Sequence, residues 1–287
     1  MQLFYKKRMK KLTDIKDLKL MANTVRQDII RMLVKAGSGH SAGPLGMADV
    51  FTALYFNVLK QDPKKPLAPN RDRLILSNGH IVPVRYAAMA RAGYFPVSEL
   101  STLRKYGSRL QGHPSRRWFP AMEAATGSLG QGVCLAVGMA LAAKLDKKKH
   151  HIYCVTSDGE HDEGSTWEAI NAASKYKLDN LIFILDRNHI QICGYTYNVW
   201  PLEPLKAKYK AFNWNVISIN GNDFKQILNA VKKAKKSKKP IIIIANVIPG
   251  KGVSFMENKY EWHGKAPDEK QAEKALSELI EARAKIR

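Results

Sequence analysis

Asp158 and Asn188 are the residues of this sequence whose chemistry and spacing point most directly to a function. Each lies just beyond an apolar run that reads as a buried strand, HIYCVT before Asp158 and LIFIL before Asn188. The chain between them has the length of one helix and one strand, so both side chains are expected at the carboxyl ends of parallel strands. In open α/β sheets, ligands bind at that edge.

The atoms offered at this edge suit a hard metal ion. The carboxylate of Asp158, the amide oxygen of Asn188 and a backbone carbonyl from the following loop are ligands that Mg²⁺ prefers, and oxygens from a diphosphate and a water would complete its octahedron. Gly159 would let the backbone approach the diphosphate closely. Because Asp-Gly is also common turn chemistry, it predicts a metal–diphosphate site only together with Asn188.

The elements that would position this edge alternate between helix and strand. Helices are expected at 13–36, 47–59, 83–92, 98–106, 129–145, 165–176, 223–236 and 268–286, and strands within 71–80 and at 151–156, 181–186, 215–219 and 240–247. This alternation predicts an α/β fold with a doubly wound, mostly parallel sheet and helices on both faces. We find no repeat and no clear linker, and expect a single domain over 1–287.

Two helices of this set carry more specific expectations. Ser165 and Glu168 have the spacing of a capping box, which predicts a helix start immediately before the run WEAINAASKYK. The segment 129–145 is apolar almost all round, which predicts a buried helix.

The charge of the chain is unusual, with a formal net charge of +22 over 287 residues. Much of it lies in three basic runs, at 5–11, 144–151 and 232–239. These runs carry no interleaved aromatic residues for base stacking, and the chain has no recognisable nucleic-acid module. We interpret them as solvated surface and expect no nucleic-acid partner, although a positive field would draw in phosphorylated substrates or an acidic partner subunit.

The sequence predicts neither a membrane span nor a secretory signal. The longest apolar run, PIIIIANVIP, is too short to cross a bilayer, and the N-terminal MQLFYKKRMKKL has no apolar h-region. The three cysteines, Cys134, Cys154 and Cys193, lack metal-ligand spacing, and their odd number fits a reducing compartment. We therefore expect a cytoplasmic protein.

Five motifs of this sequence resemble those of transketolases and follow one another in the family's order. DGEHDEGSTWEA with KLDNLIFILDRNHIQICG resembles the thiamine-diphosphate motif, and GSGHSAGPLGMADVF and RDRLILSNGH resemble the first two histidine loops. QGHPSR, ATGSLGQGVCLAVGMALA and WHGKAP resemble the third histidine loop, the thiazolium-holding loop and the last histidine loop. The resemblance runs along nearly the whole chain and implies thiamine diphosphate and Mg²⁺ as cofactors.

The resemblance also implies three groups of site residues. The metal would be held by Asp158, Asn188 and the carbonyl of Ile190. The cofactor would be contacted by His80, Gly127, Ser128, Leu129, Asp158, Gly159, Glu160 and Asn188. The catalytic group would be His40, His113 and His263, which line the sugar channel, and Glu163, which lies with Glu168 near the interface that links paired active sites in the family.

This sequence departs from the family pattern at several positions. Ser157 replaces the glycine that usually precedes Asp158, and Ser128 replaces a common proline. Ile81 and Val82 follow His80 where smaller residues are usual. The last two would narrow the channel, which bears on the choice of substrate rather than on cofactor binding.

The implied activity is transfer of a two-carbon ketol unit from a ketose, or ketose phosphate, to an aldose. Full-length transketolases are about twice as long, so the chain resembles the N-terminal, diphosphate-binding subunit of a split transketolase. The family uses a glutamate to activate the cofactor, and here that glutamate would lie on a C-terminal subunit that carries the pyrimidine-binding domain. Two copies of each subunit would form a heterotetramer. Carbohydrate metabolism, such as the pentose phosphate pathway, is the implied setting.

Other interpretations remain open at this point. A 2-oxoacid dehydrogenase subunit or a deoxyxylulose-phosphate synthase would share the Asp-Gly and Asn pattern, but not the full set of histidine loops. A second alternative is a non-catalytic binding or assembly subunit. It would be distinguished from a catalytic subunit by testing whether addition of a partner restores turnover. A nucleic-acid binder would show affinity that falls steeply with salt.

Overall fold

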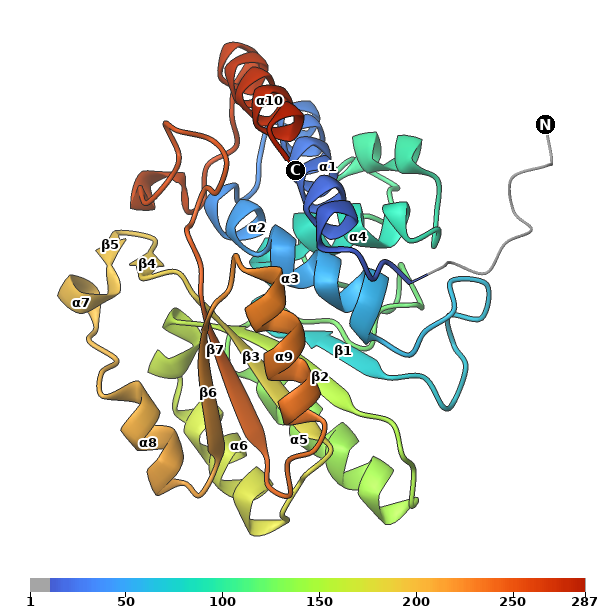
Figure 1. Cartoon of the computed structure of the whole chain (residues 1–287), viewed down its shortest axis with the longest axis vertical. Coiled ribbons are helices and arrows are strands. Elements are labelled where there is room, and N and C mark those ends of the chain that lie inside the picture. Colours follow the sequence, from blue (N-terminus) through green and yellow to red (C-terminus); the bar gives the residue numbers. More distant parts are fainter. Residues whose placement is uncertain (1–10, 287) are drawn as a thin grey trace.

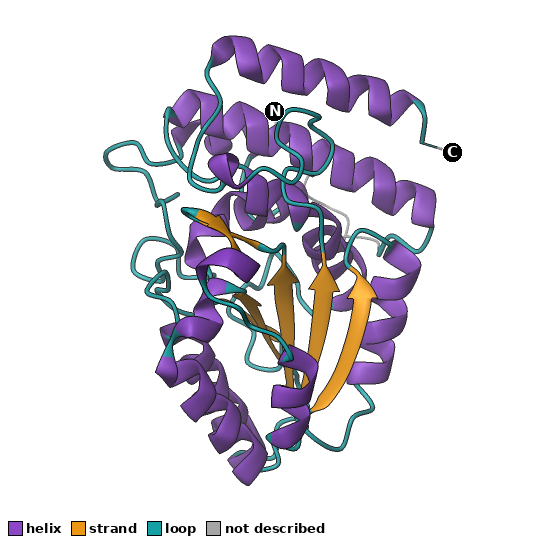
Figure 2. Ribbon diagram, turned by 90° about the vertical axis from the view of Figure 1, so that its left-hand side faces the viewer, coloured by secondary structure: helices purple, strands orange, loops and turns teal. Residues whose placement is uncertain are grey.

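The computed structural model describes residues 11–286, and a parallel sheet forms its centre (Figure 1). The sheet has five strands in the order β1-β2-β3-β7-β6, and each neighbouring pair is parallel. The strands are β1 (Arg73–Leu76), β2 (Ile152–Ser157), β3 (Leu181–Arg187), β6 (Asn215–Asn220) and β7 (Ile241–Asn246). Their arrowheads point the same way in Figure 2, so their carboxyl ends share one edge. The predicted mostly parallel α/β sheet is confirmed.

Helices cover both faces of the sheet, because successive strand residues point to opposite sides. On β3, Ile182 and Ile184 belong to one hydrophobic cluster, whereas Phe183 and Leu185 belong to another. The first cluster includes residues of α1 (Ile15–Ala36), α3 (Ala48–Ala53), α4 (Val82–Arg91), α9 (Phe224–Ala234) and α10 (Glu269–Ala284). The second includes residues of α5 (Gln131–Leu145), α6 (Gly164–Lys175) and α8 (Leu205–Ala211).

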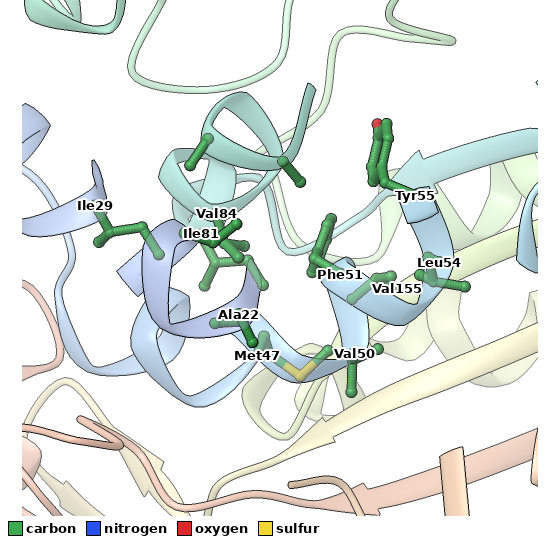
Figure 3. Packing of buried hydrophobic residues seen from close by; sticks show 14 of the residues in the cluster. Ala22, Ile29, Met47, Val50, Phe51, Leu54, Tyr55, Ile81, Val84 and Val155 are labelled. Carbon is green, nitrogen blue, oxygen red and sulfur yellow. The ribbon is translucent and has the colours of Figure 1, made fainter. Parts of the chain in front are cut away.

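The first cluster packs together the helices that flank the loops of His40 and His80. Figure 3 shows Ile29 of α1, Phe51 of α3 and Val84 of α4 among its packed side chains, together with Val155 of β2. Helix α2 (Ala42–Gly46) follows the first of these loops directly. The helix α10 packs outside α1, as a further layer at the top of Figures 1 and 2.

Several predicted helices differ from those observed. The predicted helix 47–59 is divided into α3 and a π-helical turn, Leu54–Val58. The predicted helix 98–106 is only a short 3-10 helix, Val97–Thr102. Three features between β3 and β6 were not predicted: the hairpin of β4 (Ile190–Gln191) and β5 (Gly194–Tyr195), the short helix α7 (Thr196–Val199), and α8.

The expectations for α5 and α6 were partly wrong. One side of α5 packs on β1, β2 and α6, but Leu135 on another side remains 42% exposed. A helix that is apolar all round does not reveal from its sequence which of its sides another element covers. The predicted capping box is absent, since α6 begins at Gly164 with Glu163 as its N-cap residue. The Thr166 hydroxyl instead donates to the carbonyl of Glu160, which precedes the helix.

The charge and membrane expectations can be compared with the described chain only in part. Residues 5–10 of the first basic run lie outside the described residues. The other two runs lie at the ends of α5 and α9, and most of their lysines are exposed. Over residues 11–286, no helix is both long and apolar enough to cross a membrane.

Candidate cofactor and active site

A cavity of about 420 Å³ lies at the carboxyl edge of the sheet and collects most of the predicted site residues. Its walls include His40, His80, His113, His263, Gly127, Leu129, Gly159, Asn188 and Ile190. These residues come from loops far apart in the sequence, which the parallel strands bring to one edge. Asp162, Gln191, Ile192 and Cys193 also line the cavity and were not predicted.

The predicted metal ligands lie on neighbouring strands, because β2 and β3 pair in parallel with Ser157 opposite Asp186. Asp158 is only 1% exposed. Its Oδ2 accepts a hydrogen bond from the backbone N–H of His189 at 2.7 Å. Its Oδ1 accepts no hydrogen bond of good geometry from any described residue, and faces the Arg187 guanidinium at 3.1 Å. This buried oxygen has a lone pair that a cation would satisfy.

The amide of Asn188 is held in one orientation. Its Nδ2 donates to Asp186 at 3.1 Å, and its Oδ1 accepts from the backbone N–H of Ile190, also at 3.1 Å. The nitrogen is therefore directed toward Asp186, and the oxygen keeps a second lone pair on the side of the Ile190 loop. Burial raises the pKa of the Asp158 carboxyl to about 6, although the nearby Arg187 guanidinium acts in the opposite direction.

The donor set fits a magnesium ion that enters together with a diphosphate. Among residues 11–286, no group of three His, Cys, Asp or Glu side chains is arranged to hold a metal. A metal at Asp158 would therefore depend on the neutral oxygens of Asn188 and the Ile190 carbonyl, and on oxygens from its ligand. Hard oxygen donors in small number, completed by phosphate oxygens and water, are typical of Mg²⁺ sites.

Three histidines form a cluster beside this edge. The ring centroids of His40, His80 and His263 lie 4.8 to 5.3 Å apart. Burial, with some effect of His263, lowers the pKa of His40 to about 4, and burial also lowers the pKa values of His80 and His263. The rings are therefore neutral near pH 7, and each offers one nitrogen that accepts a proton.

The loop that carries Gly127 packs tightly on two histidine segments. A Cβ atom on Gly127 would lie 2.6 Å from the ring of His113, and its φ of +138° favours glycine. A Cβ on Gly79 would lie 2.8 Å from the carbonyl of Thr126. Since Gly79 directly precedes His80, these close approaches place both histidines against the Gly127 backbone.

Four predicted residues do not line the cavity: Asp158, Glu160, Ser128 and Glu163. Glu160 is completely buried, where it accepts hydrogen bonds from the Gly130 N–H at 2.8 Å and from the hydroxyl of Ser77. It thereby holds the turn before α5, so its position favours support of the cofactor loop over contact with the cofactor. Ser128 and Glu163 are exposed and do not appear among the residues of the wall. Their predicted roles stay predictions.

Arg187 is a buried charged residue that sequence reasoning missed beside the predicted metal ligands. It lies between Asp186 and Asn188, and its side chain is 6% exposed. Its position one residue before a predicted metal ligand was the available signal, since charged residues are seldom buried without a partner.

Comparison with known proteins shows the same pattern along the chain. Residues 18–280 match the family model described as transketolase, thiamine diphosphate binding domain. The 6-deoxy-6-sulfo-D-fructose transketolase subunit SqwG of Clostridium sp. (strain MSTE9) is 45% identical over 92% of this chain and 96% of the relative. An apulose-4-phosphate transketolase subunit of Actinobacillus succinogenes is 40% identical, with the same coverage of both chains.

Longer transketolases match over part of their length. The Homo sapiens transketolase is 37% identical over 100% of this chain and 46% of its own length. The crystal structure of transketolase from Campylobacter jejuni superposes with a TM-score of 0.88, at 38% identity, over 93% of this chain and 43% of that one. The chain thus spans under half the length of these transketolases and nearly all of the two subunits. On these matches, the chain belongs to the transketolase family, in which it corresponds to the thiamine diphosphate binding domain.

Proposed function

We propose that this chain is the diphosphate-binding subunit of a two-subunit transketolase, which transfers a two-carbon ketol unit from a ketose to an aldose. The observation that carries the proposal is one cavity whose wall holds Asn188 and a cluster of neutral histidines, with the buried carboxylate of Asp158 next to Asn188 at the ends of neighbouring strands. The oxygen donors suit a metal-bound diphosphate, and the histidines suit sugar hydroxyl groups.

The residues of this chain would bind and orient the cofactor. Asp158, Asn188 and the carbonyl of Ile190 would hold Mg²⁺, and the backbone at Gly159 and the ring of His80 would lie along the diphosphate. Thiamine diphosphate supplies the carbanion chemistry that ketol transfer requires. Gly127 and Leu129 would lie along the cofactor, at the wall where the Gly127 loop packs on His113.

The histidines would handle the protons of the sugar. A neutral ring nitrogen of His40, His113 or His263 can accept a proton from a hydroxyl of the donor and return it to the acceptor. Because burial lowers the pKa values of all three, their resting role is proton acceptance. Cavity closure by a partner would bury them further and keep water away from the reacting atoms.

The partner we propose is a C-terminal transketolase subunit that carries the pyrimidine-binding domain. Two copies of this partner and two copies of this chain would form the enzyme, which we place in the cytoplasm. The relatives that match along nearly their whole length are named as subunits, which supports a partner. Glu163 and Glu168 are exposed, and a two-fold interface would cover them. Two relatives are named for a sulfonated and a phosphorylated sugar, so we propose anionic sugars, to which a charge of +22 is complementary.

The reaction class is tested with the assembled two-subunit enzyme. We expect turnover with a ketose phosphate and an aldose in the presence of Mg²⁺ and thiamine diphosphate, and no consumption of pyruvate under the same conditions. The measurement follows the product aldose and the product ketose by chromatography. Turnover of pyruvate without ketol transfer would assign the chain to a different class of thiamine enzyme.

His40→Ala, His113→Ala and His263→Ala should each lower the kcat of the assembled enzyme by about 10²–10⁴-fold, the usual range for a lost acid–base group. Cofactor affinity, measured by isothermal titration, should stay within about threefold of wild type, because these rings face the sugar rather than the diphosphate. His150→Ala, just before β2 at the opposite edge of the sheet, is the control and should keep full activity. Variants that bind the cofactor poorly but turn over normally at saturation would show that the roles are reversed.

A further inference from the structure

The side chain of Arg187 links the predicted metal site to the outside of the sheet edge. Arg187 is the last residue of β3, and its Nη1 lies 3.1 Å from Oδ1 of Asp158. Its Nη2 donates to Oε1 of Glu203 at 3.0 Å, and Nη1 donates to the hydroxyl of Thr196 at 3.4 Å. The guanidinium is therefore buried between two carboxylates, one of which is a predicted metal ligand.

The two carboxylates hold the guanidinium unequally. The Asp158 side chain is 1% exposed, so its attraction to Arg187 is weakly screened, whereas the Glu203 side chain is 65% exposed and surrounded by water. Glu203 and Thr196 also hold the guanidinium, and neither of them lines the cavity. Asp158 is the partner whose charge Arg187 neutralises.

This pairing leaves the three predicted metal ligands and Arg187, taken together, without net charge. The other predicted ligands, the Asn188 amide and the Ile190 carbonyl, are neutral, and Arg187 offsets the single negative charge of Asp158. A bare divalent cation that approached Oδ1 would meet a buried positive charge close by, and at that depth the repulsion is large. A cation that arrives with a diphosphate brings the negative charge that the predicted ligands and Arg187 together lack.

We propose that Arg187 makes metal binding by this chain conditional on the diphosphate. The guanidinium occupies the place of the cation beside Asp158 until a metal–diphosphate complex enters, and it then stays bound to Glu203 and Thr196. Arg187 is thus a positioning residue that acts through Asp158, and this role rests on the proposed metal site. Its consequence is that free divalent cations bind weakly, and that metal and cofactor bind with strong positive coupling.

The test measures binding of Mn²⁺, a paramagnetic substitute for Mg²⁺, by electron paramagnetic resonance with and without thiamine diphosphate. It is made at pH 8, so that few protons compete with the metal for the carboxylate. Arg187→Met should bind Mn²⁺ alone about tenfold or more tighter than wild type, since the repelling charge is removed. The gain in Mn²⁺ affinity on adding the cofactor should shrink by the same factor.

The matched control is Arg187→Lys, which keeps the charge and should behave as the wild type in both measurements. Arg187→Gln keeps hydrogen-bonding capacity without charge, and supplies the same measurement if the methionine variant does not fold. An affinity for Mn²⁺ alone that is unchanged or weaker in the folded, uncharged variant would overturn the proposal.

A further variant separates this inference from the metal site itself. Asp158→Asn combined with Arg187→Met should lose the gained Mn²⁺ affinity, which locates the gain at Asp158. If Asp158→Asn alone leaves metal-dependent cofactor binding intact, the site assignment fails. If it abolishes that binding while Arg187→Met changes nothing, the site stands and only the role of Arg187 is wrong.

Discussion

Asp158→Ala is expected to abolish magnesium-dependent binding of thiamine diphosphate, with an affinity at least about 100-fold below wild type. Asp158 supplies the one charged oxygen of the proposed donor set, and Oδ1 is buried with no good hydrogen bond from the described chain. A metal left with an amide and a carbonyl as protein ligands would have no anionic contact with the protein. Asn188→Ala should have a similar effect, because it removes a second oxygen ligand of the metal. It also removes the hydrogen bond from the Ile190 N–H that orients this oxygen.

The measurement is isothermal titration of thiamine diphosphate into the chain in Mg²⁺ and in a chelator. Asp179→Ala is the control. Asp179 is a partly exposed carboxylate that does not line the cavity and pairs with Lys144 at 3.3 Å, so its loss should leave binding unchanged. Thermal unfolding of each variant separates a lost ligand from a lost fold. Wild-type affinity in folded Asp158→Ala and Asn188→Ala would remove the metal site from its proposed place.

The sheet and the position of its ligand edge were predictable because both depend on local patterns. Continuous apolar runs such as 241–244 and 181–185 form central strands that are buried on both faces, as parallel sheets require. One helix and one strand separate Asp158 from Asn188, and a parallel crossover of that length places both at the same edge. The observed pairing of β2 with β3 confirms that the two strands are neighbours.

The features that sequence reasoning missed depend on contacts between distant segments. The burial of Glu160 follows from its bonds to Ser77 and Gly130, which lie 83 and 30 residues away. The open side of α5 follows from the absence of a covering element over Leu135 in the described chain, which composition alone does not reveal. The pairing of Arg187 with Asp158 joins the ends of two strands, and no periodicity in either strand encodes it.

The isolated chain is expected to show no ketol transfer, and activity should appear only with the pyrimidine-binding subunit. In transketolases, as the sequence resemblance implies, the glutamate that activates the cofactor belongs to that second domain. The cavity also looks incomplete by itself, because Ile192 on its wall is 80% exposed and Trp200 of the same segment is 64% exposed. Exposed apolar side chains around a cofactor cavity are typical of a surface that a partner covers.

The physical reason for inactivity is the loss of half of a preorganised site. The diphosphate could still bind at Asp158 and Asn188, but the far end of the cofactor would remain in water. There it would find no fixed donor or acceptor, and preorganised polar groups supply the largest part of many catalytic effects. Cofactor binding without turnover is therefore the expected state of the chain alone.

The most direct test of this account is the rate of ketol transfer from a ketose phosphate to an aldose by the purified chain with Mg²⁺ and thiamine diphosphate, measured alone and after addition of the purified second subunit. The account predicts no turnover above background for the chain alone, and turnover that rises with added second subunit to a plateau at equal amounts of the two. Robust turnover by the chain alone, in a preparation shown to be free of host transketolase, would contradict it.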